Sequence, residues 1–134
     1  MASSITSTTT LRVRYAETDR MGVVYHAHYF VWFEVARADL LRTLGWTYRE
    51  MEDAGVSLPV IEATCHYRRP ARYDDEVTVQ AEGRLASPAR MTFDYQVRIA
   101  QQPERAATGS TVHAALGADG RPRRLPERIR EAFA

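Results

Sequence analysis

The sequence contains a single cysteine, Cys65, so no disulfide bond can form within the chain. That composition fits a reducing compartment. No stretch approaches the ~20 consecutive apolar residues that a bilayer-spanning helix needs. The opening residues, MASSITSTTT, have neither the basic nor the apolar region of a secretory signal. We therefore expect a cytoplasmic protein without membrane insertion.

The sequence also lacks a large excess of either positive or negative charge, since its formal net charge at pH 7 is only +1. A chain this close to neutral does not attract nucleic acid or anionic membranes over a distance. The sequence has no Gly-rich phosphate loop, no Gly-x-Ser-x-Gly elbow and no DNA-binding signature. We therefore expect no nucleic-acid partner and no serine-hydrolase elbow.

The histidines do not form a recognisable metal-binding pattern. His26 and His28 stand two positions apart where a helix is expected to begin, so their side chains diverge. Neither joins His66, His113 or an acidic residue at a spacing typical of zinc ligands. We expect no metal and no cofactor.

The chain of 134 residues has the size of one domain. Residues 1–9 are polar and rich in Ser and Thr, which predicts a flexible N-terminal lead-in. Residues 10–134 are predicted to form a single folded domain. Within it, Leu11, Val13 and Tyr15 alternate with polar residues, which is typical of a half-buried strand.

The most apolar segment, residues 29–45, has the spacing of a helix. Its first two turns are apolar on nearly every side, which predicts a helix that is buried all round. Alternating segments separated by turn residues follow and predict an antiparallel meander. The elements expected after residue 45 are a helix at 47–54, strands at 56–67, 76–85, 91–99 and 106–116, and a helix at 126–133.

This order predicts an α+β fold in which one antiparallel sheet curves around one central helix. A single helix covers only one face of the sheet and leaves the other face and the edges open. A homo-oligomer would cover them.

Side chains capable of chemistry are densest between the first strand and the buried helix, over residues 15–29. Backbone N–H groups at a helix N-terminus have no intrahelical acceptor and can bind a developing oxyanion. A carboxylate nearby can act as a general base or as a nucleophile. Asp19 and the helix start near His26 therefore predict an acyl-transfer site. The alternative is that Asp19 only shapes a turn, a common role for Asp in loops.

The stretch RYAETDRMGVVYHAHYFVWFEVAR resembles the signature of the 4-hydroxybenzoyl-CoA thioesterase family. Within that family it is most similar to the bacterial short acyl-CoA thioesterases that accompany the Tol-Pal genes. The later segment VSLPVIEATCHYRRPARYDDEVTV and the order of elements support the resemblance, which covers roughly residues 8–130.

The resemblance implies the hotdog fold, a curved antiparallel sheet that grips one long helix. It implies that Asp19 is catalytic and that His26 donates its backbone N–H to the thioester carbonyl. Active sites in this family form between two protomers, which implies at least a dimer and favours a tetramer of two dimers. Arg90 falls where relatives place a basic contact to CoA. Gly22 and Tyr25 complete the predicted substrate-binding residues.

The resulting hypothesis is an acyl-CoA thioesterase that releases a free acid and CoA, with Asp19 as nucleophile or general base. Two alternatives share the fold: a non-catalytic acyl-CoA-binding protein, and a hydratase or dehydratase. The first usually carries a DNA-binding segment, and the second places its carboxylate elsewhere. The sequence leaves open the acyl group, the choice between CoA and acyl carrier protein, the tetramer arrangement and the pathway.

Overall fold

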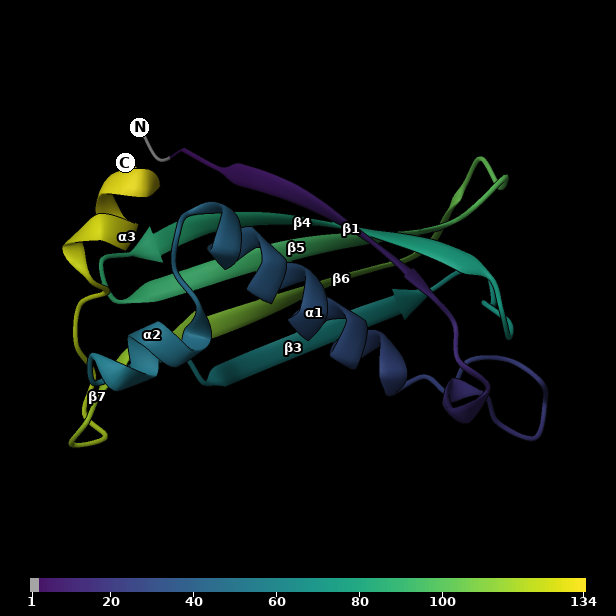
Figure 1. The fold of residues 1–134 in the computed structure, drawn as a ribbon, viewed down its shortest axis with the longest axis horizontal. Helices are drawn as coiled ribbons and strands as arrows, with labels where there is room; N and C mark the ends of the chain where they lie inside the picture. The colour runs from purple at the N-terminus through teal and green to yellow at the C-terminus, as the bar shows by residue number, and fades with distance from the viewer. Residues whose placement is uncertain (1–2) are drawn as a thin grey trace.

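A five-stranded antiparallel sheet with one long helix across one face makes up most of this computed structural model, which describes residues 3–134 (Figure 1). The strand order is β1-β4-β5-β6-β3, and β2 pairs separately with β7. Helix α1 runs along the sheet, while α2 and α3 lie at one end of it (Figure 1). The elements are β1 (Ile5–Arg12), α1 (His28–Thr43), α2 (Tyr48–Asp53), β2 (Val56–Ser57), β3 (Val60–Tyr67), β4 (Glu76–Ser87), β5 (Arg90–Ile99), β6 (Arg105–Ala114), β7 (Leu116–Gly117) and α3 (Glu127–Ala132).

The hydrophobic core lies between α1 and the sheet. Alternate residues of β5 are buried, among them Phe93, Tyr95 and Val97, so one face of the strand meets the helix. Phe33 of α1 stacks on Tyr95 with ring centroids 4.2 Å apart. Gly109 pairs with Tyr95 from β6, and a Cβ at Gly109 would collide with the Phe33 ring. The missing side chain therefore lets α1 lie close to the sheet.

The first strand is longer than the sequence predicted. β1 begins at Ile5 and pairs with β4 along its whole length. The prediction of a flexible lead-in over residues 1–9 is therefore wrong for residues 5–9, while residues 1–2 lie outside the described part of the chain. The threonines of this segment are β-branched and suit an extended backbone. In the structure the positions of this strand alternate between partly buried and exposed. The sequence does not show this alternation, because most of the side chains on both faces are polar.

The strands do not form a simple meander. β4, β5 and β6 are consecutive neighbours, but β3 pairs with β6 at the far edge of the sheet. The predicted strand at 56–67 is divided into β2 and β3 at Leu58-Pro59, because proline lacks the N–H that a ladder requires. The predicted strand at 106–116 is likewise divided at Ala115. The predicted α+β architecture, a curved antiparallel sheet against one long helix, is confirmed.

One face of α1 and the edge at β3 are exposed in the protomer. β3 has no second neighbour strand among residues 3–134, and most of its residues are exposed. Val31 and Val35 of α1 are 45% and 40% exposed. The prediction of a helix buried on every side is therefore wrong for the single protomer. These valines do not make α1 a membrane helix, since no helix within residues 3–134 is long and apolar enough to cross a bilayer.

Candidate active site

The connection from β1 to α1 is a tightly folded loop. Residues Tyr15–Glu17 form a 3-10 turn, after which Thr18 and Val24 form an isolated antiparallel bridge. The Gly22 N–H donates to the Asp19 carbonyl at 2.9 Å and closes the turn inside this bridge. Gly22 has a φ of 77°, a conformation that glycine adopts without strain. The loop therefore holds Asp19 in a defined orientation.

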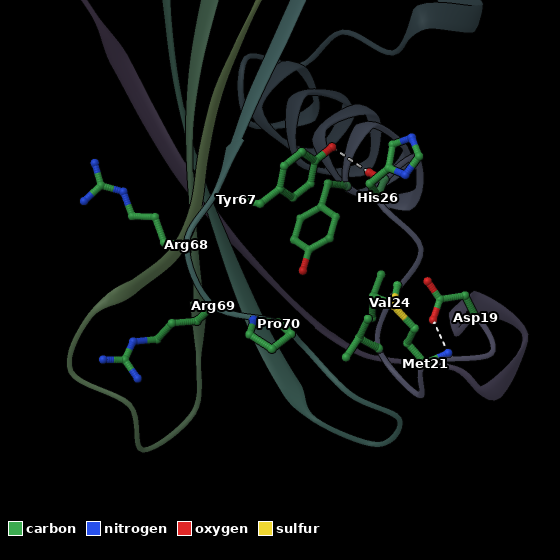
Figure 2. Close-up of a pocket in the computed structure, with 10 residues that line it drawn as sticks. Asp19, Met21, Val24, His26, Tyr67, Arg68, Arg69 and Pro70 are labelled. Carbon is green, nitrogen blue, oxygen red and sulfur yellow. Dashed lines mark hydrogen bonds between the residues drawn. The ribbon is translucent and has the colours of Figure 1, made fainter.

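The half-buried Asp19 carboxylate has one oxygen engaged in the turn. Oδ1 accepts a hydrogen bond from the Met21 backbone N–H at 2.9 Å. Oδ2 has no hydrogen-bond partner among residues 3–134 and lies on the side facing His26 (Figure 2). The two roles considered for Asp19 are therefore compatible, because one oxygen shapes the turn while the other is available for chemistry.

Glu17 ties the loop to α1. Glu17 is 3% exposed, and its Oε2 accepts a hydrogen bond from the Trp32 indole N–H at 2.9 Å. Oε1 accepts from the Arg14 backbone N–H at 2.8 Å. Burial alone raises the pKa of Glu17, but these two hydrogen bonds and the Arg14 guanidinium outweigh burial, so the pKa lies below its ordinary value. A buried, ionised Glu17 thus positions the loop against the helix.

The N-terminus of α1 is open toward this loop. Its N-cap residue, Ala27, offers no side-chain acceptor, and the His26 N–H has no hydrogen-bond acceptor within residues 3–134. The Tyr67 hydroxyl donates to the His26 carbonyl at 2.8 Å and holds this backbone in place. Burial raises the pKa of Tyr67, which keeps the hydroxyl protonated as a donor. A free N–H at the positive end of a helix dipole favours an oxyanion.

These groups meet in a pocket of about 300 Å³. Asp19 and His26 lie on one side of it, and Tyr67 and Pro70 on the other, while the Arg68 side chain points away from Asp19 (Figure 2). The wall is mostly apolar apart from these groups. The residues that line the pocket are Asp19, Met21, Val23, Val24, His26, Tyr29, Tyr67, Arg68, Arg69 and Pro70.

The pocket brings together Asp19 and His26 but not the other predicted site residues. Gly22 shapes the turn without lining the pocket, and the Tyr25 ring packs on His26, 4.4 Å away between centroids. Tyr67 pairs with Ala107, which pairs with Val97, so the pocket lies near the C-terminal end of β5. Arg90 begins that strand and lies at its opposite end within the protomer.

Two residues of the site, Tyr67 and Glu17, were not predicted from the sequence. Tyr67 reaches the pocket only because β3 crosses to the edge of the sheet beside the start of α1, which no local pattern reveals. Glu17 was a polar loop residue with no apolar pattern around it. The sequence offered no pattern that pairs Glu17 with Trp32, its hydrogen-bond donor fifteen positions later. Within residues 3–134, no group of three or more His, Cys, Asp or Glu side chains is placed to hold a metal.

Two relatives found by sequence comparison carry the names of a putative acyl-CoA thioesterase and of a CoA-thioester hydrolase. YneP of Bacillus subtilis is 48% identical over 69 residues, which are 52% of this chain and 50% of that protein, so the match spans about half of it. A protein named 1,4-dihydroxy-2-naphthoyl-CoA hydrolase from Synechococcus elongatus is 31% identical over 122 residues, covering 89% of this chain and 88% of its own.

Comparison with solved structures also finds a CoA thioesterase. A structure described as a DHNA-CoA thioesterase from Staphylococcus aureus superposes with a TM-score of 0.86 and 36% identity, over 95% of this chain and 85% of that one. The family model for the thioesterase-like superfamily matches residues 13–133, from the end of β1 to α3. This chain therefore belongs to the thioesterase-like superfamily, as the resemblance of its loop and helix residues to a thioesterase family signature led us to expect.

Proposed function

We propose that the protein hydrolyses acyl-CoA thioesters in this pocket. The observation that supports it most lies on one wall of the pocket: an Asp19 oxygen and the His26 N–H at the start of a helix both lack a hydrogen-bond partner among residues 3–134. An acyl-transfer site needs these two groups, one to deliver a nucleophile and one to bind the oxyanion. Relatives named for the hydrolysis of CoA thioesters support the same chemistry.

In the proposed reaction the thioester carbonyl oxygen faces the His26 N–H. Negative charge develops on that oxygen as the carbonyl is attacked, and the helix dipole stabilises it there. The Tyr67 hydroxyl holds the adjoining carbonyl at 2.8 Å, so the donor does not have to reorganise during the reaction. Catalysis benefits most from groups that are already oriented toward the developing charge.

Asp19 serves by one of two routes. As a nucleophile, Oδ2 attacks the carbonyl and expels CoA thiolate, and water then cleaves the mixed anhydride to the free acid. As a general base, Asp19 takes a proton from a water that attacks directly. Transfer of solvent oxygen-18 into the Asp19 carboxylate in a single turnover would identify the nucleophilic route.

We assign supporting roles to Gly22 and Tyr25 in substrate binding. Gly22 permits the turn that presents Asp19, since its φ of 77° is unfavourable for other residues. Tyr25 is 47% exposed, and its ring lies beside that of His26, which lines the pocket. It offers a flat surface that the pantetheine arm of the substrate can cross.

A second copy of the chain completes the site in this proposal. The β3 edge lacks a partner strand within residues 3–134, Ile61 is exposed on β3, and Val31 and Val35 are exposed on α1. Antiparallel pairing of two β3 edges about a twofold axis would satisfy the edge and cover this apolar surface. It would also turn the second copy's Arg90 end toward the pocket, where that arginine contacts CoA. Two such dimers would form the proposed tetramer.

The first test is thiol release by the wild-type protein and by Asp19→Asn. The panel should contain straight-chain acyl-CoAs of different length and a hydroxylated aromatic acyl-CoA, the class named for two relatives. We expect Asp19→Asn to lower kcat by a factor on the order of 10² to 10⁴. Asp53→Asn is the matched control, since Asp53 is exposed on α2, away from the pocket.

Near-wild-type turnover by a folded Asp19→Asn variant would refute the assignment of this carboxylate. Loss of enoyl-CoA absorbance without thiol release would indicate a hydratase instead. Tight CoA binding with no turnover on any substrate would indicate the non-catalytic binding protein.

A further inference from the structure

Tyr29 closes the inner end of the proposed active-site pocket. It is 2% exposed and Val24 is 5% exposed, and both line the pocket. Met21, His26 and Arg68 also line it but are exposed to solvent. The buried residues therefore form the inner end of the pocket, and the exposed residues form its mouth.

The Tyr29 ring is held in one place. It belongs to the first turn of α1, and its centroid lies 4.7 Å from that of Trp32 and 5.0 Å from that of Tyr67. The Tyr67 ring stands nearly perpendicular to it, at an interplanar angle of 86°. These contacts keep the phenol ring from swinging, so its hydroxyl group keeps a fixed position.

The hydroxyl group of Tyr29 has a hydrogen that it does not donate. Burial raises the pKa of Tyr29 and outweighs a hydrogen bond from the Ala71 backbone, which acts to lower the pKa, so the hydroxyl stays protonated. A backbone N–H only donates, so the Tyr29 oxygen is the acceptor in that bond. The hydroxyls of Tyr67 and Tyr95 have side-chain or backbone partners, whereas no group within residues 3–134 accepts a hydrogen bond from Tyr29.

The contact with Ala71 places this hydroxyl at the wall of the pocket. Ala71 follows Pro70, which lines the pocket on the side away from Asp19 (Figure 2). The Ala71 carbonyl accepts a hydrogen bond from the Val24 N–H at 2.8 Å, which fixes this segment. The unused hydrogen of Tyr29 therefore lies at the inner end of the pocket.

A donor without a protein acceptor influences which acyl group fits there. In the free protein, water can accept its hydrogen bond. A plain hydrocarbon acyl group would displace that water and leave the donor unpaired, which costs free energy. An acyl group with an oxygen atom in reach would replace the water and restore the bond.

The proposed reaction sets which part of the substrate meets Tyr29. The thioester carbonyl faces the His26 N–H, and the large CoA group leaves through the exposed mouth of the pocket. The acyl group then extends the other way, past Val24 and toward Tyr29.

We propose that Tyr29 determines which acyl groups the protein prefers, because its hydroxyl donates a hydrogen bond to a hydroxyl or oxo oxygen on the acyl group. Acyl-CoAs that carry such an oxygen are then preferred to plain acyl-CoAs with the same carbon skeleton. This inference rests on the proposed thioesterase function, which leaves the acyl group open.

The test compares Tyr29→Phe with the wild-type protein on pairs of thioesters that differ by one oxygen. Benzoyl-CoA is paired with each of its monohydroxy derivatives, and butyryl-CoA is paired with 3-hydroxybutyryl-CoA. For the preferred oxygen-bearing substrate, KM should rise about three- to tenfold with kcat nearly unchanged, because one neutral hydrogen bond is lost before and during the reaction alike. KM for its plain partner should stay the same or fall, since no unpaired hydroxyl is covered.

The pair that responds shows whether the acyl group is aromatic or aliphatic. Tyr29→Phe keeps the ring that packs on Trp32 and Tyr67, so we expect it to fold. The wild-type protein alone gives a second measurement. If it has no lower KM for any oxygen-bearing substrate than for the plain partner, the proposal is overturned whatever the variant does.

Tyr95→Phe is the matched control. Tyr95 is 1% exposed and its hydroxyl bonds with Arg37 and Thr111, so this variant also loses a buried hydroxyl group, but one that does not line the pocket. Its ratio of the two KM values should equal that of the wild-type protein. A change of ratio as large as that of Tyr29→Phe would overturn the proposal.

Two further results would also overturn it. An unchanged KM ratio for every pair in Tyr29→Phe would show that the hydroxyl selects nothing and would leave hydrolysis standing. An equal fall of kcat on plain and oxygen-bearing substrates would show that Tyr29 acts on the reaction and not on the choice of acyl group.

Calorimetric binding of thioethers, which cannot be hydrolysed, separates this proposal from the proposed function. The probes are S-benzyl-CoA and its monohydroxy derivatives. If the wild-type protein hydrolyses nothing, weaker binding of a hydroxylated probe alone by Tyr29→Phe would still support the role of Tyr29. Equal binding of all probes by both proteins would overturn it.

Discussion

A chain of hydrogen bonds leads from the partly buried Arg37 on α1 into the core, through side chains that the proposed reaction does not use. Arg37 donates to the Tyr95 hydroxyl at 3.4 Å, and that hydroxyl lies 2.6 Å from the Thr111 hydroxyl. The Thr111 hydroxyl meets His113 Nε2 at 2.9 Å. His113 Nδ1 lies 3.0 Å from the Leu58 carbonyl, which can only accept, so Nδ1 carries the proton. The neutral form of His113 therefore satisfies every group in the chain.

His113 makes the stability of the protein depend on pH. Burial lowers its pKa from 6.5 to about 4, so the unfolded chain binds a proton at a higher pH than the folded one. This stabilising contribution is complete above pH 6.5 and is lost as the pH falls toward 4. The free energy of unfolding should drop by roughly 3 kcal/mol over that range through His113 alone.

Urea unfolding between pH 4 and pH 8 measures this effect. His113→Gln removes the titrating group, so its stability should change less steeply with pH than that of the wild-type protein, although its stability at pH 7 is lower. Parallel pH profiles for the two proteins would contradict the prediction.

At the scale of elements, the close packing of α1 on β6 depends on one position without a side chain. A Cβ at Gly109 would collide with the Phe33 ring and with the Thr64 carbonyl of the neighbouring strand. Gly109→Ala should therefore destabilise the fold by about 1–3 kcal/mol, because either the helix or the strand has to move. Thermal or urea unfolding measures the change.

A double-mutant cycle with Phe33→Leu tests the origin of that cost. The smaller side chain makes room for the new methyl group, so Gly109→Ala should cost less in this background than in the wild-type protein. The rescue should be partial, because the Thr64 carbonyl remains. An equal cost in both backgrounds would show that the Phe33 ring is not the source of the strain.

At the scale of the whole molecule, we expect copies to associate through the exposed apolar side of α1 and the β3 edge. Val31→Lys places a charge on a side chain that is 45% exposed in the protomer, so the protomer should fold normally. The proposed dimer would have to bury that charge, which is costly without a partner. We expect dissociation to monomers in light scattering and a loss of thiol release.

Thr8→Lys is the control for that experiment. It introduces the same charge on β1, the opposite edge of the sheet, at an exposed position. It should keep the oligomeric state and the activity of the wild-type protein. Unchanged mass for Val31→Lys would contradict association through this face.

Several elements could be predicted because their signals are local. The apolar spacing of residues 29–45 predicts α1, and the turn residues predict the hairpins that join β4, β5 and β6. The start of β1 could not be predicted from its polar threonines, since its pairing with β4 decides that they form a strand. The edge position of β3 could not be predicted either, because a crossover between distant strands leaves no trace in a short window.

By itself the sequence determined the fold class and the loop that carries Asp19 and His26, because hydrophobic spacing and turn chemistry act between residues close in the chain. The family resemblance rested on the residues of that loop and of the helix after it. The tertiary structure decided which residues from distant parts of the chain contact that loop. It alone placed Tyr67 on the His26 carbonyl and buried Glu17 against Trp32. Those contacts join segments far apart in sequence, and strand pairing and core packing establish them only in the folded chain.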